Sequence, residues 1–287
     1  MKRAIDAVRG LSAGPGALYE GRMLIAQLSD PHVRPQGMLY QGVVDSNAMF
    51  RAAIAQVNGL DPQPDVVLLT GDLVDKGTLD EYEMLRGLLA PLRAPFLAIP
   101  GNHDEREAFR WTFFDQPHTP SEGPINYVAD GFGPLRIVAV DVTLPGLHHG
   151  DFDEDHAQWL DRVLAAEPER PTLIMLHHPP FECSVPYMDT YICRNGERLK
   201  DVVARHPTVE RIVCGHVHRH MQLRFGGTLL CTAPSTTTAI ALQFRPDAEP
   251  QSCVEPPAFL LHHWRPEVGL ITHLLPIGTF AGPYPFA

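Results

Sequence analysis

Five short polar clusters carry the side chains of this sequence that are best suited to chemistry. They read Asp30-Pro31-His32, Gly71-Asp72, Gly101-Asn102-His103-Asp104, His177-His178 and Gly215-His216-Val217-His218. Aspartate, asparagine and histidine without cysteine are typical ligands of borderline to hard metal ions such as Mn, Fe, Co or Zn. The clusters therefore predict a metal site with oxygen and nitrogen ligands.

Taken singly, most of these clusters have an ordinary structural interpretation. The Gly-Asp and Gly-Asn pairs are common turn material, and an isolated histidine pair most often faces solvent. His177-His178 is a more specific signal, because Pro179-Pro180 follows it and prevents the strand from continuing. A rigid turn of this kind at the end of a buried strand is typical of a functional loop.

Each cluster directly follows an apolar run that predicts a buried strand. These runs are Met23–Leu28, Val66–Leu69, Phe96–Ile99, Leu173–Leu176 and Arg211–Cys214. Helical spacing of apolar residues alternates with them, over Val43–Leu60, Leu79–Leu89, Glu154–Ala166 and Glu197–Arg205. This alternation predicts an α/β fold with helix-covered strands. Ligands bind at the carboxyl ends of such strands, where all five clusters lie.

The rest of the chain adds two strands and a distinct C-terminal region. Leu135–Val140 and Thr228–Thr232 are predicted strands, and 259–264 with 269–275 predict a β-pair at the edge of the sheet. Residues 240–275 are interpreted as a possible cap or oligomerisation segment. We expect residues 1–22 to be a disordered leader and residues 23–287 to form one domain.

Composition limits the kinds of partner that the protein can have. The 287 residues carry a formal charge of −11 without a basic stripe, which argues against binding a nucleic acid polymer. Five cysteines without Cys-x-x-Cys spacing argue against a disulfide framework and favour a cytoplasmic location. No stretch approaches the ~20 apolar residues that a membrane span needs.

Seven ligands suffice for two metal ions if one carboxylate bridges the ions. Asp72 is the natural bridge, because it follows a central strand. Two ions about 3.5–4 Å apart form a clamp for in-line phosphoryl displacement.

The order Asp-x-His, Gly-Asp, Gly-Asn-His-Asp, a histidine ending a strand, and Gly-His-x-His resembles the calcineurin-like metallophosphoesterase superfamily over Met23 to His218. Within it, the chain resembles the class III cyclic nucleotide phosphodiesterase branch and its glycerophosphodiesterase members. The resemblance implies a four-layer α/β/β/α sandwich holding two divalent or trivalent ions. It implies one metal held by Asp30, His32, Asp72 and His218, and another held by Asp72, Asn102, His177 and His216.

The same resemblance implies roles for two further histidines. His103 would face the phosphate without ligating a metal, and it would assist the leaving group or stabilise charge in the transition state. His178 would orient a ligand through its ring. Thr236, Thr237 and Thr238 stand where some members carry a pocket histidine, so the substrate preference stays open. We expect the loop Phe181–Asn195 to form a substrate lid.

The resemblance implies a phosphodiesterase that acts on glycerophosphodiesters or cyclic nucleotides by in-line attack of a metal-bound hydroxide. We also expect a homo-oligomer. One alternative is a phosphomonoesterase or phosphonate monoester hydrolase. Another is a non-catalytic interaction scaffold on the same fold. A scaffold should have lost ligands, whereas none of the seven positions is replaced here.

Overall fold

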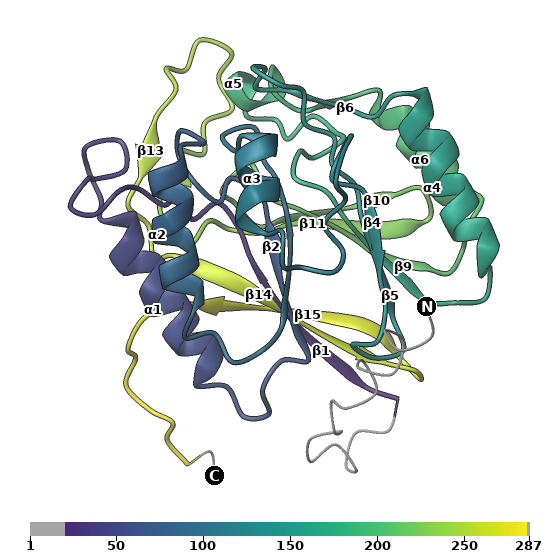
Figure 1. Cartoon of the computed structure of the whole chain (residues 1–287), viewed down its shortest axis with the longest axis horizontal. Helices are drawn as coiled ribbons and strands as arrows, with labels where there is room; N and C mark the ends of the chain where they lie inside the picture. The colour runs from purple at the N-terminus through teal and green to yellow at the C-terminus, as the bar shows by residue number, and fades with distance from the viewer. Residues whose placement is uncertain (1–20, 286–287) are drawn as a thin grey trace, which may run out of the picture.

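A computed structural model of the chain describes residues 21–285 as a mixed α/β fold built on two main sheets (Figure 1). One sheet has the strand order β15-β14-β1-β2-β3 and the other has the order β10-β11-β9-β7-β5-β4. The expected leader, residues 1–22, lies almost entirely outside the described residues.

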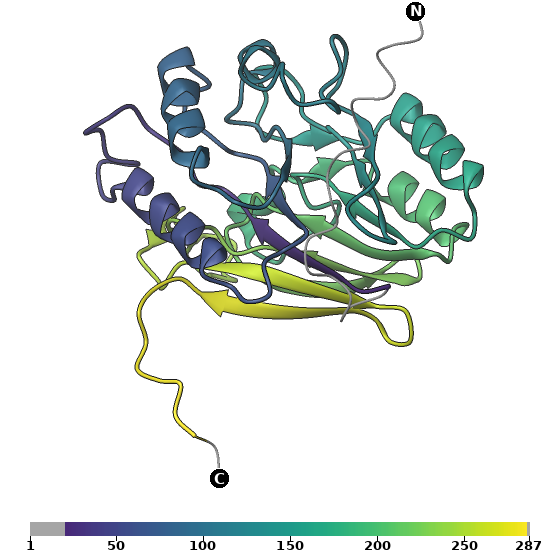
Figure 2. The same ribbon diagram turned by 60° about the horizontal axis from the view of Figure 1, so that its bottom comes forward.

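The first sheet contains three of the predicted ligand-bearing strands. β1 (Met23–Leu28), β2 (Val66–Thr70) and β3 (Phe96–Ile99) run parallel to one another. β14 (Ala258–Arg265) pairs antiparallel with β1, and β15 (Gly269–Pro276) forms the outer edge. Figure 2 shows this C-terminal pair alongside β1. The predicted edge pair is therefore confirmed.

The second sheet contains the other two ligand-bearing strands, β7 (Thr172–Met175) and β9 (Val209–Cys214). They lie between β5 (Arg136–Ala139) and β11 (Thr228–Thr232), and these four strands are parallel. An antiparallel strand forms each edge of this sheet: β4 (Tyr127–Ala129) at one edge and β10 (Met221–Phe225) at the other. The remaining strands form two separate two-stranded sheets, β6 (Gly150–Asp151) with β8 (Cys193–Arg194) and β12 (Ala239–Ile240) with β13 (Ser252–Cys253).

The helices lie in two groups at opposite sides of the sheets (Figures 1 and 2). α1 (Ser46–Asn58), α2 (Leu79–Leu89) and α3 (Arg106–Thr112) accompany the first sheet, and α4 (Glu154–Ala166) and α6 (Gly196–Ala204) accompany the second. The short α5 (Pro186–Asp189) lies in the predicted lid loop. Asp45 caps α1 by accepting from the Ala48 N–H at 2.9 Å.

Alternate residues of the second sheet pack toward different layers. Ile137, Leu173 and Val213 belong to the same apolar core as Ile25 and Leu68 of the first sheet. Their neighbours Val138, Ile174 and Ile212 pack instead with residues of α4 and α6. The mixed α/β class is confirmed, while the full order of a four-layer sandwich stays a prediction.

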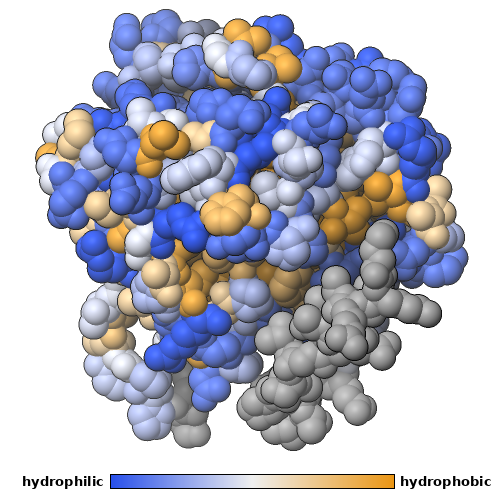
Figure 3. Space-filling view, viewed as in Figure 1, coloured by the Kyte–Doolittle hydropathy of each residue, from blue (hydrophilic) through white to orange (hydrophobic). Residues whose placement is uncertain are grey.

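Hydrophilic side chains predominate on the face that Figure 3 shows, and hydrophobic ones gather there in small separate groups. None of the helices between residues 21 and 285 has the length and apolar character that a membrane crossing requires.

Candidate metal centre

The turns that follow β1, β2 and β9 place their polar residues in strained backbone conformations. Left-handed φ angles occur at Asp30 (53°), His32 (42°), Asp72 (48°), His216 (73°) and His218 (52°). Such angles cost on the order of 1–3 kcal/mol at non-glycine residues and concentrate at functional sites. Five of the eight non-glycine residues with positive φ in the described chain belong to the predicted ligands.

The glycines of these motifs allow the turns to approach one another closely. A Cβ on Gly101 would lie 2.2 Å from Asp72 Oδ1, and a Cβ on Gly215 would lie 2.2 Å from Ser29 Oγ. No other residue type fits at either position without moving the turns apart.

The first group of ligand atoms joins both sheets. His32 Nε2 lies 3.1 Å from His218 Nε2 and 3.7 Å from Asp72 Oδ2, and His218 Nε2 lies 3.4 Å from Asp30 Oδ1. All four side chains are buried, and their ligand atoms lie within 4.8 Å of one another. This arrangement fits a single cation.

The segment after β11 supports the first group from behind. The Thr238 carbonyl accepts from His218 Nδ1 at 2.8 Å, which leaves Nε2 of that ring to face the group. Ser235 and Thr237 donate their hydroxyls to the Asp30 carbonyl at 2.8 and 3.2 Å. This polar segment therefore supports Asp30 and His218 from behind, a role that the sequence did not indicate.

The second group contains His177, His178 and His216, all buried and with ligand nitrogens within 4.8 Å of one another. The Thr70 carbonyl accepts from His177 Nδ1 at 2.7 Å and leaves Nε2 toward the group. His178 donates through Nε2 to the His148 carbonyl at 3.1 Å, so its Nδ1 stays available. His178 thus presents an unpaired ring nitrogen to this group. The sequence predicted only that His178 orients a ligand.

Asn102 follows the turn that packs against the second group. A Cβ on the preceding Gly101 would lie 2.8 Å from His177 Nε2. Asn102 Nδ2 lies 3.3 Å from His148 Nδ1, and Asn102 Oδ1 is buried without a hydrogen-bond partner. An unpaired carboxamide oxygen at this position suits a metal ligand.

Asp72 lies between the two groups. Its Oδ1 is 3.3 Å from His177 Nε2 in the second group, and its Oδ2 is 3.7 Å from His32 Nε2 in the first. The Asp72 side chain is almost fully buried. One carboxylate therefore presents one oxygen to each group of ligands.

His103 stands beside the groups and is partly open to solvent. The backbone N–H of His103 donates to Asp72 Oδ1 at 2.9 Å, and its ring Nδ1 donates to the Asp75 carbonyl at 2.8 Å. The ring therefore has Nε2 free, and 27% of the side chain is exposed. A phosphate that reached the centre could contact this nitrogen.

A family model described as calcineurin-like phosphoesterase matches residues 23–220. The chain belongs to this family. A probable glycerophosphodiester phosphodiesterase GpdQ from Arcobacter nitrofigilis is 36% identical over 265 residues, 92% of this chain and 97% of that protein. The 3',5'-cyclic adenosine monophosphate phosphodiesterase CpdA of Escherichia coli K12 is 30% identical over 227 residues, 79% of each chain.

Solved structures agree on the fold. A dimetal phosphatase from Danio rerio has a TM-score of 0.60 at 16% identity, over 89% of this chain and 99% of that one. The predicted superfamily is confirmed by these comparisons.

The electrostatics of this phosphoesterase centre favour bound cations. Burial alone would raise the pKa of Asp72, but His177, His103 and His32 outweigh it and hold that pKa well below its usual value. Burial lowers the pKa of His32 and His216 well below the usual value, so both rings are neutral as metal ligands must be. Burial also lowers the pKa of His177, yet Asp72 raises it to about 9. His177 thus holds a positive charge that a metal ion would replace.

Several buried polar atoms of the phosphoesterase centre have no hydrogen-bond partner among the described residues. They are His177 Nε2, both ring nitrogens of His216, His178 Nδ1, His32 Nδ1 and Asn102 Oδ1. An unpaired buried polar group costs roughly 1–3 kcal/mol, so native proteins rarely leave several together. Nitrogen and oxygen donors of this kind fit divalent metal ions.

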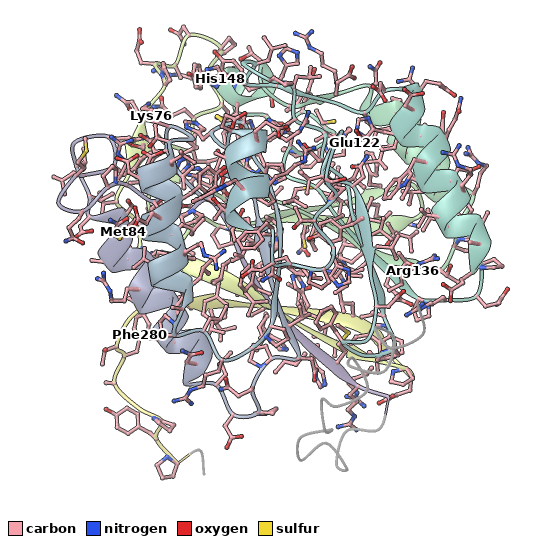
Figure 4. The ribbon with its side chains drawn as sticks, in the orientation of Figure 1. Lys76, Met84, Glu122, Arg136, His148 and Phe280 are labelled. Atoms are coloured by element: carbon pink, nitrogen blue, oxygen red, sulfur yellow. The ribbon has the colours of Figure 1, made fainter. Side chains whose placement is uncertain are left out.

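The predicted lid lies next to this centre. His148 makes an edge-on ring contact with Tyr191 at 5.7 Å, and Tyr191 makes a similar contact with Tyr187 at 5.2 Å. Met188 packs in a small apolar cluster with Val217, which stands between two of the predicted ligands. Figure 4 places His148 at the same end of the molecule as Lys76, which follows β2. A lid role for this loop stays a prediction.

Proposed function

We propose that this phosphoesterase hydrolyses small phosphodiesters at a centre of two metal ions held by seven side chains. One ion would bind Asp30, His32, Asp72 and His218, and the other would bind Asp72, Asn102, His177 and His216. The observation that carries the proposal is the position of the Asp72 carboxylate, with one oxygen toward each group. A single carboxylate so placed suits a bridge between two ions.

The bound ions would supply Lewis-acid stabilisation of the phosphoryl oxygens and an activated water for in-line attack. The protein's own groups complete the chemistry. Thr70 and Thr238 hold the rings of His177 and His218 with Nε2 toward the centre. The Asp75 carbonyl accepts from His103 Nδ1, so Nε2 is free to face the phosphate. In the imidazolium form, which carries a proton on both ring nitrogens, Nε2–H can contact the phosphate and pass its proton to the departing alkoxide.

Glycerophosphodiesters are the proposed substrate class. The GpdQ relative aligns with 92% of this chain, whereas the CpdA relative aligns with 79%. The larger overlap and the higher identity favour the glycerophosphodiesterase assignment over the cyclic nucleotide one. Cyclic nucleotides stay the second candidate, because both relatives are named as phosphodiesterases.

Two alternative functions have less support. A phosphomonoesterase or phosphonate monoester hydrolase could use the same metal centre, so a comparison of substrates is needed to distinguish it from a phosphodiesterase. A non-catalytic scaffold would not need the complete set of ligands, yet the six predicted Asp and His ligands converge in two groups. Beyond catalysis, we include in the proposal one domain over 23–287 and a homo-oligomer in which 240–275 forms a cap or a subunit contact.

The test is a turnover comparison on the purified full chain, treated with chelator and then resupplied with Mn²⁺. The substrates are glycerophosphoethanolamine, 3',5'-cAMP, bis-p-nitrophenyl phosphate and p-nitrophenyl phosphate. We expect metal-dependent turnover, with the glycerophosphodiester fastest among the natural compounds and the diester ahead of the monoester. A faster monoester, or hydrolysis that survives chelation, would contradict the proposal.

A further inference from the structure

A buried carboxamide joins the two main sheets close to the candidate metal centre. Gln27 on β1 is fully buried, and its Nε2 donates to Thr70 Oγ1 on β2 and to the Cys214 carbonyl on β9, both at 3.0 Å. β1 and β2 belong to one sheet and β9 to the other. Thr70 and Cys214 each stand two residues before a predicted ligand, Asp72 and His216.

The hydrogen bonds around Gln27 have a defined direction. A carbonyl such as that of Cys214 can only accept, so the amide nitrogen faces it and Oε1 faces His262 Nε2 at 3.1 Å. His262 therefore donates through Nε2, and its Nδ1 accepts from the Thr272 hydroxyl at 2.9 Å. Arg211 in turn donates to that hydroxyl oxygen at 2.8 Å. Donation therefore runs in one direction, from Arg211 through Thr272 and His262 to Gln27.

From Gln27, the hydrogen bonds continue through Thr70 to residues that precede or orient the predicted ligands. Thr70 Oγ1 donates to Ser29 Oγ at 2.8 Å, and Ser29 directly precedes Asp30. The Thr70 carbonyl accepts from His177 Nδ1 at 2.7 Å and so fixes the direction of that ring. Gln27 is thus one hydrogen bond away from the residue that orients a ligand of the second group.

Both ligand groups depend on the spacing between the sheets. The first group takes Asp30 from the end of β1 and His218 from the end of β9. The second group lies after β7 and β9 of one sheet, and Asp72 after β2 of the other sheet reaches it through Oδ1, 3.3 Å from His177 Nε2. Metal–ligand distances tolerate only about ±0.2 Å. The sheets otherwise meet largely through apolar side chains, which set no direction and allow small shifts.

We infer that Gln27 is a positioning residue that fixes the separation of the two sheets at the metal centre. It does so by tying β1, β2 and β9 together just before their ligand-bearing turns. The inference rests on the proposed two-metal function. The simpler alternative is that Gln27 only satisfies buried hydrogen bonds and contributes to stability. Under that alternative, replacing Gln27 would leave the affinity for metal ions unchanged.

The test compares Gln27→Met with a matched variant of another hydrogen bond between the sheets. Tyr127 on β4 donates its hydroxyl to the Ala98 carbonyl on β3 at 2.8 Å, so Tyr127→Phe removes one such bond away from Gln27. Chelator-treated full-length protein is titrated with Mn²⁺ by calorimetry, and the Mn²⁺–Mn²⁺ coupling is followed by electron paramagnetic resonance. Thr70→Val is a milder second variant if Gln27→Met does not fold.

We expect Gln27→Met to weaken Mn²⁺ binding by about 10–100-fold and to change or abolish the coupled signal. Thr70→Val should act in the same direction, and Tyr127→Phe should lower thermal stability while leaving affinity and signal at wild-type values. Wild-type affinity and coupling in Gln27→Met or Thr70→Val would overturn this inference alone. A wild-type protein without a coupled Mn²⁺ pair would overturn the proposed function and this inference together.

Discussion

At the residue scale, Asp72 is the proposed bridge between two cations, because its two oxygens face different ligand groups. Sequence motifs predicted which Asp and His side chains converge, since metal chemistry restricts both residue type and spacing; their roles as ligands stay a prediction. They did not reveal the free His178 Nδ1 or the Thr238 carbonyl that supports His218. Such contacts join segments far apart in the chain, and residue type alone does not encode them.

Replacing Asp72 by Asn removes the charge of the proposed bridge while keeping the size of the side chain. We expect the bound metal to fall below two ions per chain and diester turnover to fall by about 100-fold or more, since loss of a supporting contact alone costs 10–100-fold. Elemental analysis and turnover measure both effects. Asp115→Asn, at an exposed ion pair with Arg86, is the control and should change neither quantity.

Replacing His103 by Gln tests its separation from the metal ligands. We expect kcat to fall by about 10²–10⁴-fold with unchanged metal content, because a proton-transfer group is lost and no ligand is. His118→Gln, at a ring that packs against Tyr127 and Phe132, serves as control. Loss of metal from the His103 variant would show instead that this ring is a ligand.

At the scale of elements, the strands and their turns carry the site. The bounds of β1, β3, β11, α2 and α4 agree with the sequence predictions, because each combines clear periodicity with a turn or a cap. α3 was not predicted, because it is only seven residues long and Glu105, an unusual capping residue, caps it. The three-residue strand β4 is likewise too short for a pattern of its own.

His262 on β14 makes a pH-dependent contribution to stability. Burial, with help from Arg211 and His220, lowers its pKa to about 3 in the folded protein. Above pH 6.5 the ring is neutral in both states, and below it only the unfolded chain gains a proton, so folding stability falls as pH drops toward 3. As the pH falls from 6.5 to 4, His262 lowers the free energy of unfolding by about 3 kcal/mol.

Chemical denaturation of the metal-free protein across that pH range measures the effect. His262→Gln should lose about 3 kcal/mol less unfolding free energy than the wild type between the two ends of the range. Parallel stability curves for the two proteins would contradict a neutral buried His262.

At the scale of the whole molecule, two sheets meet so that both contribute to the first ligand group, and Asp72 of one sheet reaches His177 of the other. The formal charge of −11 opposes an anionic substrate, and metal ions in the centre would offset that field locally. The sequence predicted the fold class and family, because five strand ends carry the motifs. It could not predict how Gln27 joins the sheets, since that contact depends on their packing.

Metal binding should stabilise the whole domain. Mn²⁺ at 100 times its dissociation constant adds about 2.7 kcal/mol per site to a protein that binds it only when folded. Thermal unfolding with and without Mn²⁺ measures the shift, with Ca²⁺ as a comparison ion. An unfolding temperature that does not rise with Mn²⁺ would argue against a built metal centre.

Anomalous diffraction at the manganese edge, from crystals grown with Mn²⁺, tests the central claim most directly. We expect two peaks about 3.5–4 Å apart with Asp72 coordinating both. A single peak, no peak in the cleft, or a pair of ions that Asp72 does not bridge would contradict a two-metal phosphodiesterase.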